Sequence, residues 1–134
     1  MARTLLIALS WFTLTAFAQA ETPLENALAR AKENRKELET ALKEAPDEQK
    51  KGVTFLIENM PDSDLRTLSA PFLRENVELA YRARNELPWG KKVPEEIFLN
   101  DVLPYANVDE KRENWRREFF EMCLPMVKDC KTAS

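Results

Sequence analysis

Helix-start signals recur along this chain, and they constrain its fold more than any other feature. Proline and polar capping residues suit the first turn of a helix, where backbone N–H groups have no partner inside the helix. Residues 22–25 (TPLE) form a capping box with proline at the first helical position, and residues 34–37 (NRKE) offer a second cap of the same type. Similar starts occur at 45–48 (APDE), 69–71 (SAP) and 94–96 (PEE). The chain therefore predicts a succession of helices.

Apolar residues behind these signals repeat at helical spacing. One buried face is expected at positions i, i+3, i+4 and i+7, occupied by Val53, Leu56, Ile57 and Met60. Gly52 lies in the same segment, where it costs about 1 kcal/mol relative to alanine, so we expect either close packing against a neighbour or a frayed first turn. Residues 53–57 (VTFLI) are the best strand candidate, but they fit the helical face better. The sequence predicts an all-α fold, a compact bundle of five to six short to medium helices.

The prolines also suggest where the helices end. Residues 22–45 should form either two short helices or one long helix with a joint at Asn34. Asp62 or Ser63 should cap a short turn that carries Leu65 and Leu68. The remaining helices are expected over 46–60, 69–87 with Phe72, Leu73, Val77, Ala80 and Tyr81 inside, and 94–103 with Ile97, Phe98, Val102 and Leu103 inside.

The last expected helix begins at Asn107 or Asp109 and is rich in aromatic and sulfur-containing residues. Its buried face should consist of Trp115, Phe119, Met122, Cys123 and Val127. Pro125 should kink or end this helix.

The cysteines Cys123 and Cys130 belong to the same segment. Along a continuous helix they would be roughly 10 Å apart, whereas a disulfide needs Cα atoms within about 7 Å. A bridge would require the helix to break at Pro125, so free or buried thiols are favoured. Core packing also explains Cys123 better than catalysis, because a reactive thiol needs a helix N-terminus or a neighbouring histidine.

The first 20 residues have the pattern of a secretion signal. Arg3 supplies the positive charge, and the apolar run 5–17 is about 13 residues long, which is too short to span a bilayer. Residues 18–20 (AQA) form a small-x-small cleavage site, so Glu21 is the expected mature N-terminus; an uncleaved N-terminal anchor is the alternative. We expect residues 21–134 to be exported to the periplasm or the extracellular space, with no membrane contact after cleavage.

Composition excludes several kinds of chemistry within this chain. The absence of histidine removes Ser-His-Asp and Cys-His pairs and, with only two cysteines, most zinc sites. Two glycines are too few for a phosphate-binding loop. The chain has 20 basic and 23 acidic residues. Because Arg3 is the only charged residue of the leader, residues 21–134 carry a net charge of −4, with positive and negative residues interspersed. We therefore expect no nucleic-acid partner, no cofactor and no metal.

Paired carboxylates are the remaining route to catalysis. Glu95 with Glu96, and Asp109 with Glu110, are the obvious pairs. Both lie at expected helix starts, where acidic residues favour the positive end of the helix dipole. Capping explains them without any reaction, so no catalytic residue is assigned and the chain is not expected to be an enzyme on its own.

Aromatic residues offer a candidate interface. Trp89, Tyr105 and Trp115 could form a recognition surface, and Arg116 beside Trp115 leaves room for an anionic or interfacial contact. The alternative is that the rings complete the core, which is the commoner fate of such residues. Both interpretations stay open at this point.

Three stretches resemble the N-terminal region of exported bacterial transglutaminase-like proteins: 55–61 (FLIENMP), 94–105 (PEEIFLNDVLPY) and 114–132 (NWRREFFEMCLPMVKDCKT). The resemblance covers most of the mature chain, from about Asn34 onward. It implies a helical module that is followed by a papain-like core with a Cys-His-Asp triad. Cys123 and Cys130 do not match that nucleophile, so residues 21–134 are expected to be truncated before the catalytic core.

Two functional hypotheses follow. In the first, the chain is a non-catalytic helical N-terminal module that supports a missing transglutaminase-like core and presents an apolar face to it. In the second, it is a freestanding periplasmic or extracellular module that binds a protein partner through the region of Trp89, Tyr105 and Trp115.

Overall fold

The computed structural model describes residues 22–107 and 109–131, and in these residues the chain is all-α, as predicted, without a strand. The expected signal peptide, 1–20, lies outside the described residues. The described part contains seven α-helices, one more than the predicted maximum, because the joint at Asn34 separates two helices and the turn after Pro61 is itself a helix. Their bounds are α1 Pro23–Arg30, α2 Arg35–Glu44, α3 Asp47–Asn59, α4 Asp62–Leu65, α5 Ala70–Glu86, α6 Glu95–Ile97 and α7 Trp115–Val127.

Of the two caps predicted for α1 and α2, the first is confirmed and the second is wrong. The hydroxyl of Thr22 accepts a hydrogen bond from the backbone N–H of Glu25 at 3.2 Å, as the capping box predicts. Asn34 marks the joint but does not cap α2. Its side-chain amide donates instead to the carbonyls of Leu65 and Leu68, both at 2.9 Å. The carbonyls after α4 need donors, and Asn34 therefore ties the start of α2 to the α4–α5 turn.

Helix α3 has the predicted buried face. Val53, Leu56, Ile57 and Met60 are all buried. Gly52 is in close contact with a neighbour, because a Cβ at this position would lie 2.9 Å from the Tyr81 ring. Close packing, rather than a frayed turn, accounts for this glycine.

The predicted cap of α4 is wrong, and the predicted cap of α5 is confirmed. Pro61 occupies the position before α4, so neither Asp62 nor Ser63 caps it. The carboxylate of Asp62 pairs with Arg30 at 2.7 Å instead. Ser69 does cap α5, accepting from the N–H of Phe72 at 3.4 Å. On α5, Leu73, Val77 and Ala80 are buried and Phe72 and Tyr81 are partly buried, as expected.

Helix α6 continues directly into a single π-helical turn, Phe98–Val102, in which the N–H of Leu103 donates to the carbonyl of Phe98 at 2.8 Å. Phe98 and Leu103 are buried as predicted, but Ile97 is 47% exposed. The expectation for Ile97 was wrong because the wider turn places Phe98 and Leu103 inward and leaves Ile97 outside.

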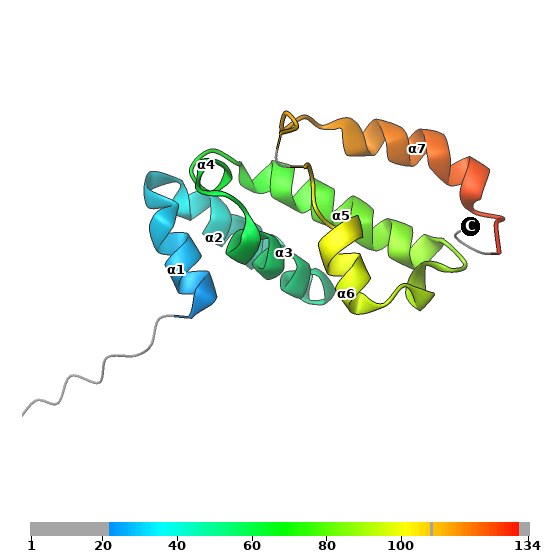
Figure 1. Ribbon diagram of the computed structural model, residues 1–134, viewed down its shortest axis with the longest axis horizontal. Coiled ribbons are helices and arrows are strands. Elements are labelled where there is room, and N and C mark those ends of the chain that lie inside the picture. Colours follow the sequence, from blue (N-terminus) through cyan, green and yellow to red (C-terminus); the bar gives the residue numbers. More distant parts are fainter. Residues whose placement is uncertain (1–21, 108, 132–134) are drawn as a thin grey trace, which may run out of the picture.

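The helices surround α5, which runs through the middle of the molecule (Figure 1). Helix α3 packs against α1, α2 and α5, whereas α7 lies along α5, side by side with it and in the same direction. The main core is formed where α1 to α5 and the π-turn meet. Helix α7 is therefore a peripheral layer on α5.

Helix α7 begins at Trp115, several residues later than predicted. The carboxylate of Glu110 accepts from the backbone N–H of Asn107 at 2.9 Å, which closes a local turn in place of a helix. Pro125 lies inside α7, which continues to Val127, and both cysteines are free thiols. The prediction of free thiols is confirmed.

Candidate functional site

The outward face of α7 carries a row of large apolar side chains in solvent. Trp115, Phe119, Met122 and Met126 are 38%, 53%, 58% and 73% exposed. They follow one another at i, i+4, i+7 and i+11, so they lie in line along one face of the helix. We call these four residues the outer stripe. Phe119 and Met122 were expected in the core, and that expectation was wrong, whereas for Trp115 an exposed position was one of the two interpretations left open.

A second apolar face of α7 attaches it to α5. Phe120, Cys123, Leu124 and Val127 are partly buried, and none of the helix is fully buried. The guanidinium of Arg82 lies 4.7 Å from the centre of the Phe120 ring, and Arg117 pairs with Glu75. A peripheral helix packs against the rest of the protein on one side only, so when it is apolar on two sides, one of them stays exposed. The outer stripe is the side that α5 leaves uncovered.

Arg116 fixes the first turn of α7 against the end of the π-turn. Its guanidinium donates to the carbonyls of Val102 at 3.0 Å and Leu103 at 3.4 Å, and to that of Pro104. These carbonyls lie where a helix ends, so they lack partners in the helix and attract a cation. Burial lowers the pKa of Arg116. The side chain of Arg116 therefore binds the backbone of the π-turn in the same chain.

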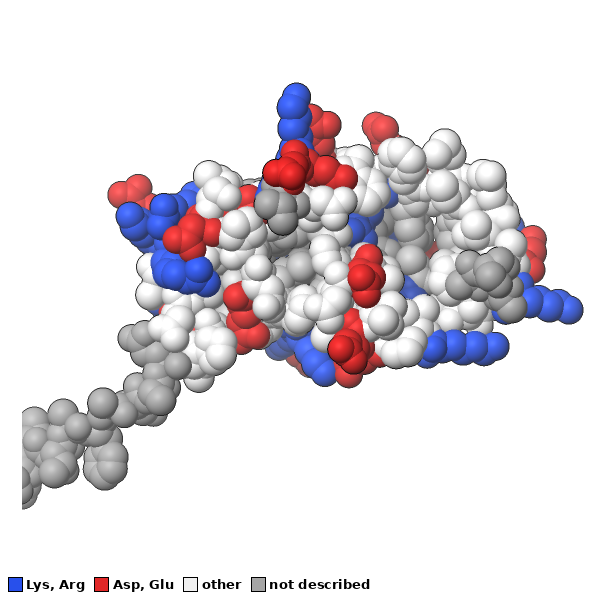
Figure 2. All heavy atoms as spheres, viewed as in Figure 1, with Lys and Arg blue, Asp and Glu red and all other residues white. Residues whose placement is uncertain are grey.

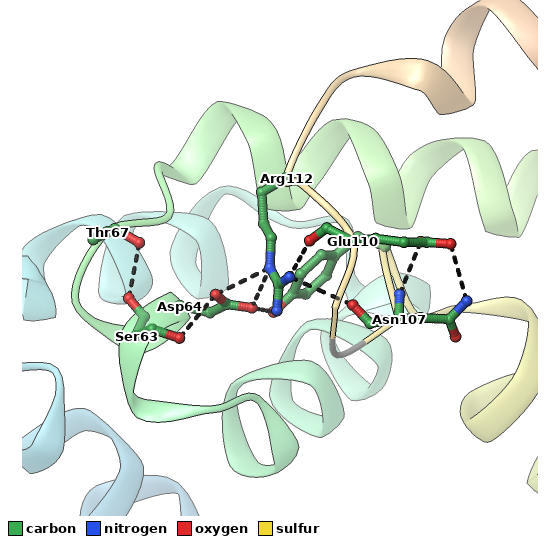
Figure 3. A network of polar contacts seen from close by, with 7 residues as sticks. Ser63, Asp64, Thr67, Asn107, Glu110 and Arg112 are labelled. Atoms are coloured by element: carbon green, nitrogen blue, oxygen red, sulfur yellow. Dashed lines mark hydrogen bonds and ion pairs between the residues drawn. The ribbon is translucent and has the colours of Figure 1, made fainter.

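A buried carboxylate holds the segment that leads into α7. Asp64, at the end of α4, is 4% exposed and accepts a 2.6 Å hydrogen bond from the hydroxyl of Tyr105. Arg112 donates from Nε to both carboxylate oxygens, at 2.9 and 3.1 Å (Figure 3). Burial, and then the hydrogen bond to Asp64, raise the pKa of Tyr105, since both oppose a phenolate. The hydrogen bonds of Asp64 therefore attach the segment before α7 to α4.

The four residues predicted as an interface do not form one surface. Tyr105 is buried, and its ring packs edge-on against Phe72 with centroids 5.6 Å apart. Trp89 is half-buried after α5, with its indole N–H lacking a partner among the described residues. Trp115 and Arg116 are neighbours, with the guanidinium carbon 5.3 Å from the centre of the indole ring. Of the four, only Trp115 belongs to the outer stripe.

Sequence reasoning missed Met126 as a surface residue and the pairing of Asp64 with Arg112. A signal for the outer stripe was present, because apolar residues of the last helix occupy two faces rather than one. Asp64 and Arg112 are 48 positions apart, and no local pattern connects them.

Two of the candidate carboxylates, Glu95 and Glu110, have partners in the structure, and Glu110 lies before α7 rather than at its start as expected. Glu95 pairs with Lys51 at 2.9 Å, and this contact lowers the pKa of Glu95. Hydrogen bonds from Asn107 lower the pKa of Glu110. Across residues 22–107 and 109–131, no group of three or more metal-ligating side chains is found.

Several hollows lie near the start of α7, and two of them involve the residues described above. A pocket of about 170 Å³ beside Tyr105 is lined mainly by apolar side chains of α3 and the segment after the π-turn. A shallower hollow of about 490 Å³ is formed by Glu110, Lys111, Glu113, Trp115 and Phe119. The second hollow opens onto the outer stripe, because it shares Trp115 and Phe119 with it. The surface over α7 is largely uncharged in the view of Figure 2.

No family model matches this chain, and no curated protein or solved structure matches it either. The resemblance of 55–61, 94–105 and 114–132 to transglutaminase-like proteins therefore stays a prediction. Within the described part of the chain, no helix is both long and apolar enough to cross a membrane.

Proposed function

We propose that this chain is a non-catalytic helical module that associates with another protein through the outer stripe of α7. The observation that carries this proposal is the alignment of four large apolar side chains, 38% to 73% exposed, on one helical face. Contiguous exposed apolar surface commonly marks a contact site, and aromatic residues and methionine are enriched in interfaces.

The way in which α7 is held supports the same function. Arg116 bonds to three carbonyls, Arg117 pairs with Glu75, and the Asp64 network fixes the preceding segment. A helix that is already ordered loses less conformational entropy on binding than a flexible segment does. The outer stripe is thus preorganised for a partner.

The sequence suggests what kind of protein the partner is. The resemblance to transglutaminase-like proteins favours a papain-like core, which the module would support without taking part in the reaction. A separate periplasmic or extracellular protein is the alternative, and both would contact the same face. The leader-like residues 1–20 support a function after export in either case.

Site-specific photo-crosslinking in the producing cells tests the proposal. A benzoylphenylalanine in place of Met126, the most exposed residue of the stripe, should give one discrete adduct with another protein. The matched control is the same probe at the exposed Lys43 on α2, which should give none. The adduct should disappear when Phe119→Ser is added. Equal adducts at both positions, or none at Met126, would count against the proposal.

A further inference from the structure

We infer that the segment bound by the outer stripe is an amphipathic helix whose apolar face is bordered by lysine or arginine. This inference rests on the proposed function and adds the chemistry of the partner. It depends on two independent features of the described residues, namely the spacing of the stripe and the sign of the charges around it.

The spacing favours a helix as the occupant. Intervals of four, three and four residues between Trp115, Phe119, Met122 and Met126 are those of a coiled-coil seam. The row extends for roughly 17 Å along α7, about two heptads. Trp115 and Phe119 pack edge to face at 5.8 Å, whereas Met122 and Met126 have adaptable side chains. The side chains of a facing helix can pack into the gaps between the side chains of such a row.

The charge around the stripe is mainly negative. By helical spacing, Glu118 lies beside the stripe on α7, and Asp129 follows in the turn directly after the helix ends at Val127. Neither takes part in an ion pair within the described residues, and Glu113 next to Trp115 takes part in none either. The two arginines of the helix are directed elsewhere, because Arg116 donates to backbone carbonyls at the end of the π-turn and Arg117 pairs with Glu75.

The hollow at the start of α7 suits a cationic side chain. Trp115 and Phe119 form its apolar part, and Glu110 and Glu113 supply carboxylates against a single Lys111. Glu110 accepts hydrogen bonds from the backbone and side chain of Asn107, which keep it in its charged form. A lysine or arginine of the partner can lie along the rings with its charged end near the carboxylates.

The same charges disfavour two other occupants. A second copy of the chain would bring its own Glu118 and Asp129 to the contact, while its Arg116 and Arg117 are held by groups of their own chain. A membrane surface rich in anionic lipid would be repelled by these carboxylates. A protein helix with basic borders is complementary to both the apolar stripe and its acidic edge.

Two designed peptides test the inference against the purified protein. Both are helices of about 18 residues, roughly 27 Å long, with leucine at the seam positions. One has lysine at all bordering positions and the other has glutamate. Fluorescence anisotropy of labelled peptide should show at least about tenfold tighter binding of the lysine peptide, equivalent to about 1.4 kcal/mol, and the gap should narrow as salt is added.

Variants separate the two features. Phe119→Ser with Met122→Ser should abolish binding of the lysine peptide, and circular dichroism should show an unchanged fold because both side chains are exposed. Glu118→Lys with Asp129→Lys should reverse the preference to the glutamate peptide. The matched control, Glu33→Lys with Glu48→Lys, makes the same charge change at exposed positions outside α7 and should leave the preference unchanged.

Other results would overturn the inference. Equal affinity for both peptides would remove the charge preference, while a positive crosslink at Met126 would leave the proposed function intact. A dimer seen by sedimentation and lost in Phe119→Ser would identify a second copy as the occupant. Binding to vesicles of phosphatidylcholine and phosphatidylglycerol, but not to the lysine peptide, would identify a lipid surface.

Discussion

Replacement of Tyr105 by phenylalanine isolates one contact of the Asp64 network. The hydroxyl of Tyr105 donates to Asp64 at 2.6 Å, and the ring packs against Phe72. The substitution deletes the hydroxyl and keeps the ring, so it opens no large cavity. Asp64 retains Arg112 on both of its oxygens. The change therefore measures the hydrogen bond to a buried carboxylate rather than the loss of packing.

The expected cost is about 2 kcal/mol of the free energy of unfolding. Hydrogen bonds to charged groups contribute about 1.5–3 kcal/mol, and the bonds that Asp64 retains favour the lower half of this range. Because domains of this size have stabilities of about 5–15 kcal/mol, the variant should remain folded. With a urea m value of about 2 kcal/mol/M, the unfolding midpoint should fall by about 1 M.

Urea titrations followed by circular dichroism at the helical band measure this cost. A double-mutant cycle with Asp64→Ala provides the control. That variant should lose about 3–5 kcal/mol, because it removes the buried carboxylate to which both Tyr105 and Arg112 donate. In the Asp64→Ala background, Tyr105→Phe should cost less than about 0.5 kcal/mol, since the acceptor is gone. A cost for Tyr105→Phe that is equal in both backgrounds, or negligible in the parent, would refute the network as described.

Three other properties of the molecule can be checked directly. The pKa of Tyr105 is higher in the folded chain than in the unfolded chain, so its stabilising effect is complete below about pH 10 and is lost as the pH rises further; urea midpoints should decline above that pH, and less steeply in Tyr105→Phe. Arg116→Met should keep the core but release α7, with a loss of about 1.5–3 kcal/mol and faster hydrogen exchange in Trp115–Val127, whereas unchanged exchange there would show that the three carbonyl bonds do not hold the helix. Mass spectrometry of the exported protein should give Glu21 as the first residue, and retention of residues 1–20 would support an uncleaved anchor instead.

Local signals in the sequence predicted most of the helix starts. Thr22 and Ser69 cap their helices as expected, because a cap depends only on residues a few positions away. The buried face of α3 was predicted for the same reason. Helical spacing alone identifies the side of a helix that is richest in apolar residues.

The errors occur where distant parts of the chain compete with local signals. Asparagine is a good capping residue, but the side-chain amide of Asn34 donates to the carbonyls of Leu65 and Leu68 instead. Periodicity also shows that a face is apolar without showing whether a neighbour covers it. For α7, Phe120 lies toward α5 while Phe119 is exposed, and adjacent phenylalanines give no local signal of which one is buried.

Methionine oxidation tests most directly whether the outer stripe is a contact surface. In the purified protein, Met122 and Met126 should react quickly with hydrogen peroxide, and the buried Met60 should react slowly. In the producing cells, peroxide treatment before lysis should find the two stripe methionines protected, with Met60 unchanged. Equal reactivity of Met126 in both settings would contradict the claim that a partner protein covers α7.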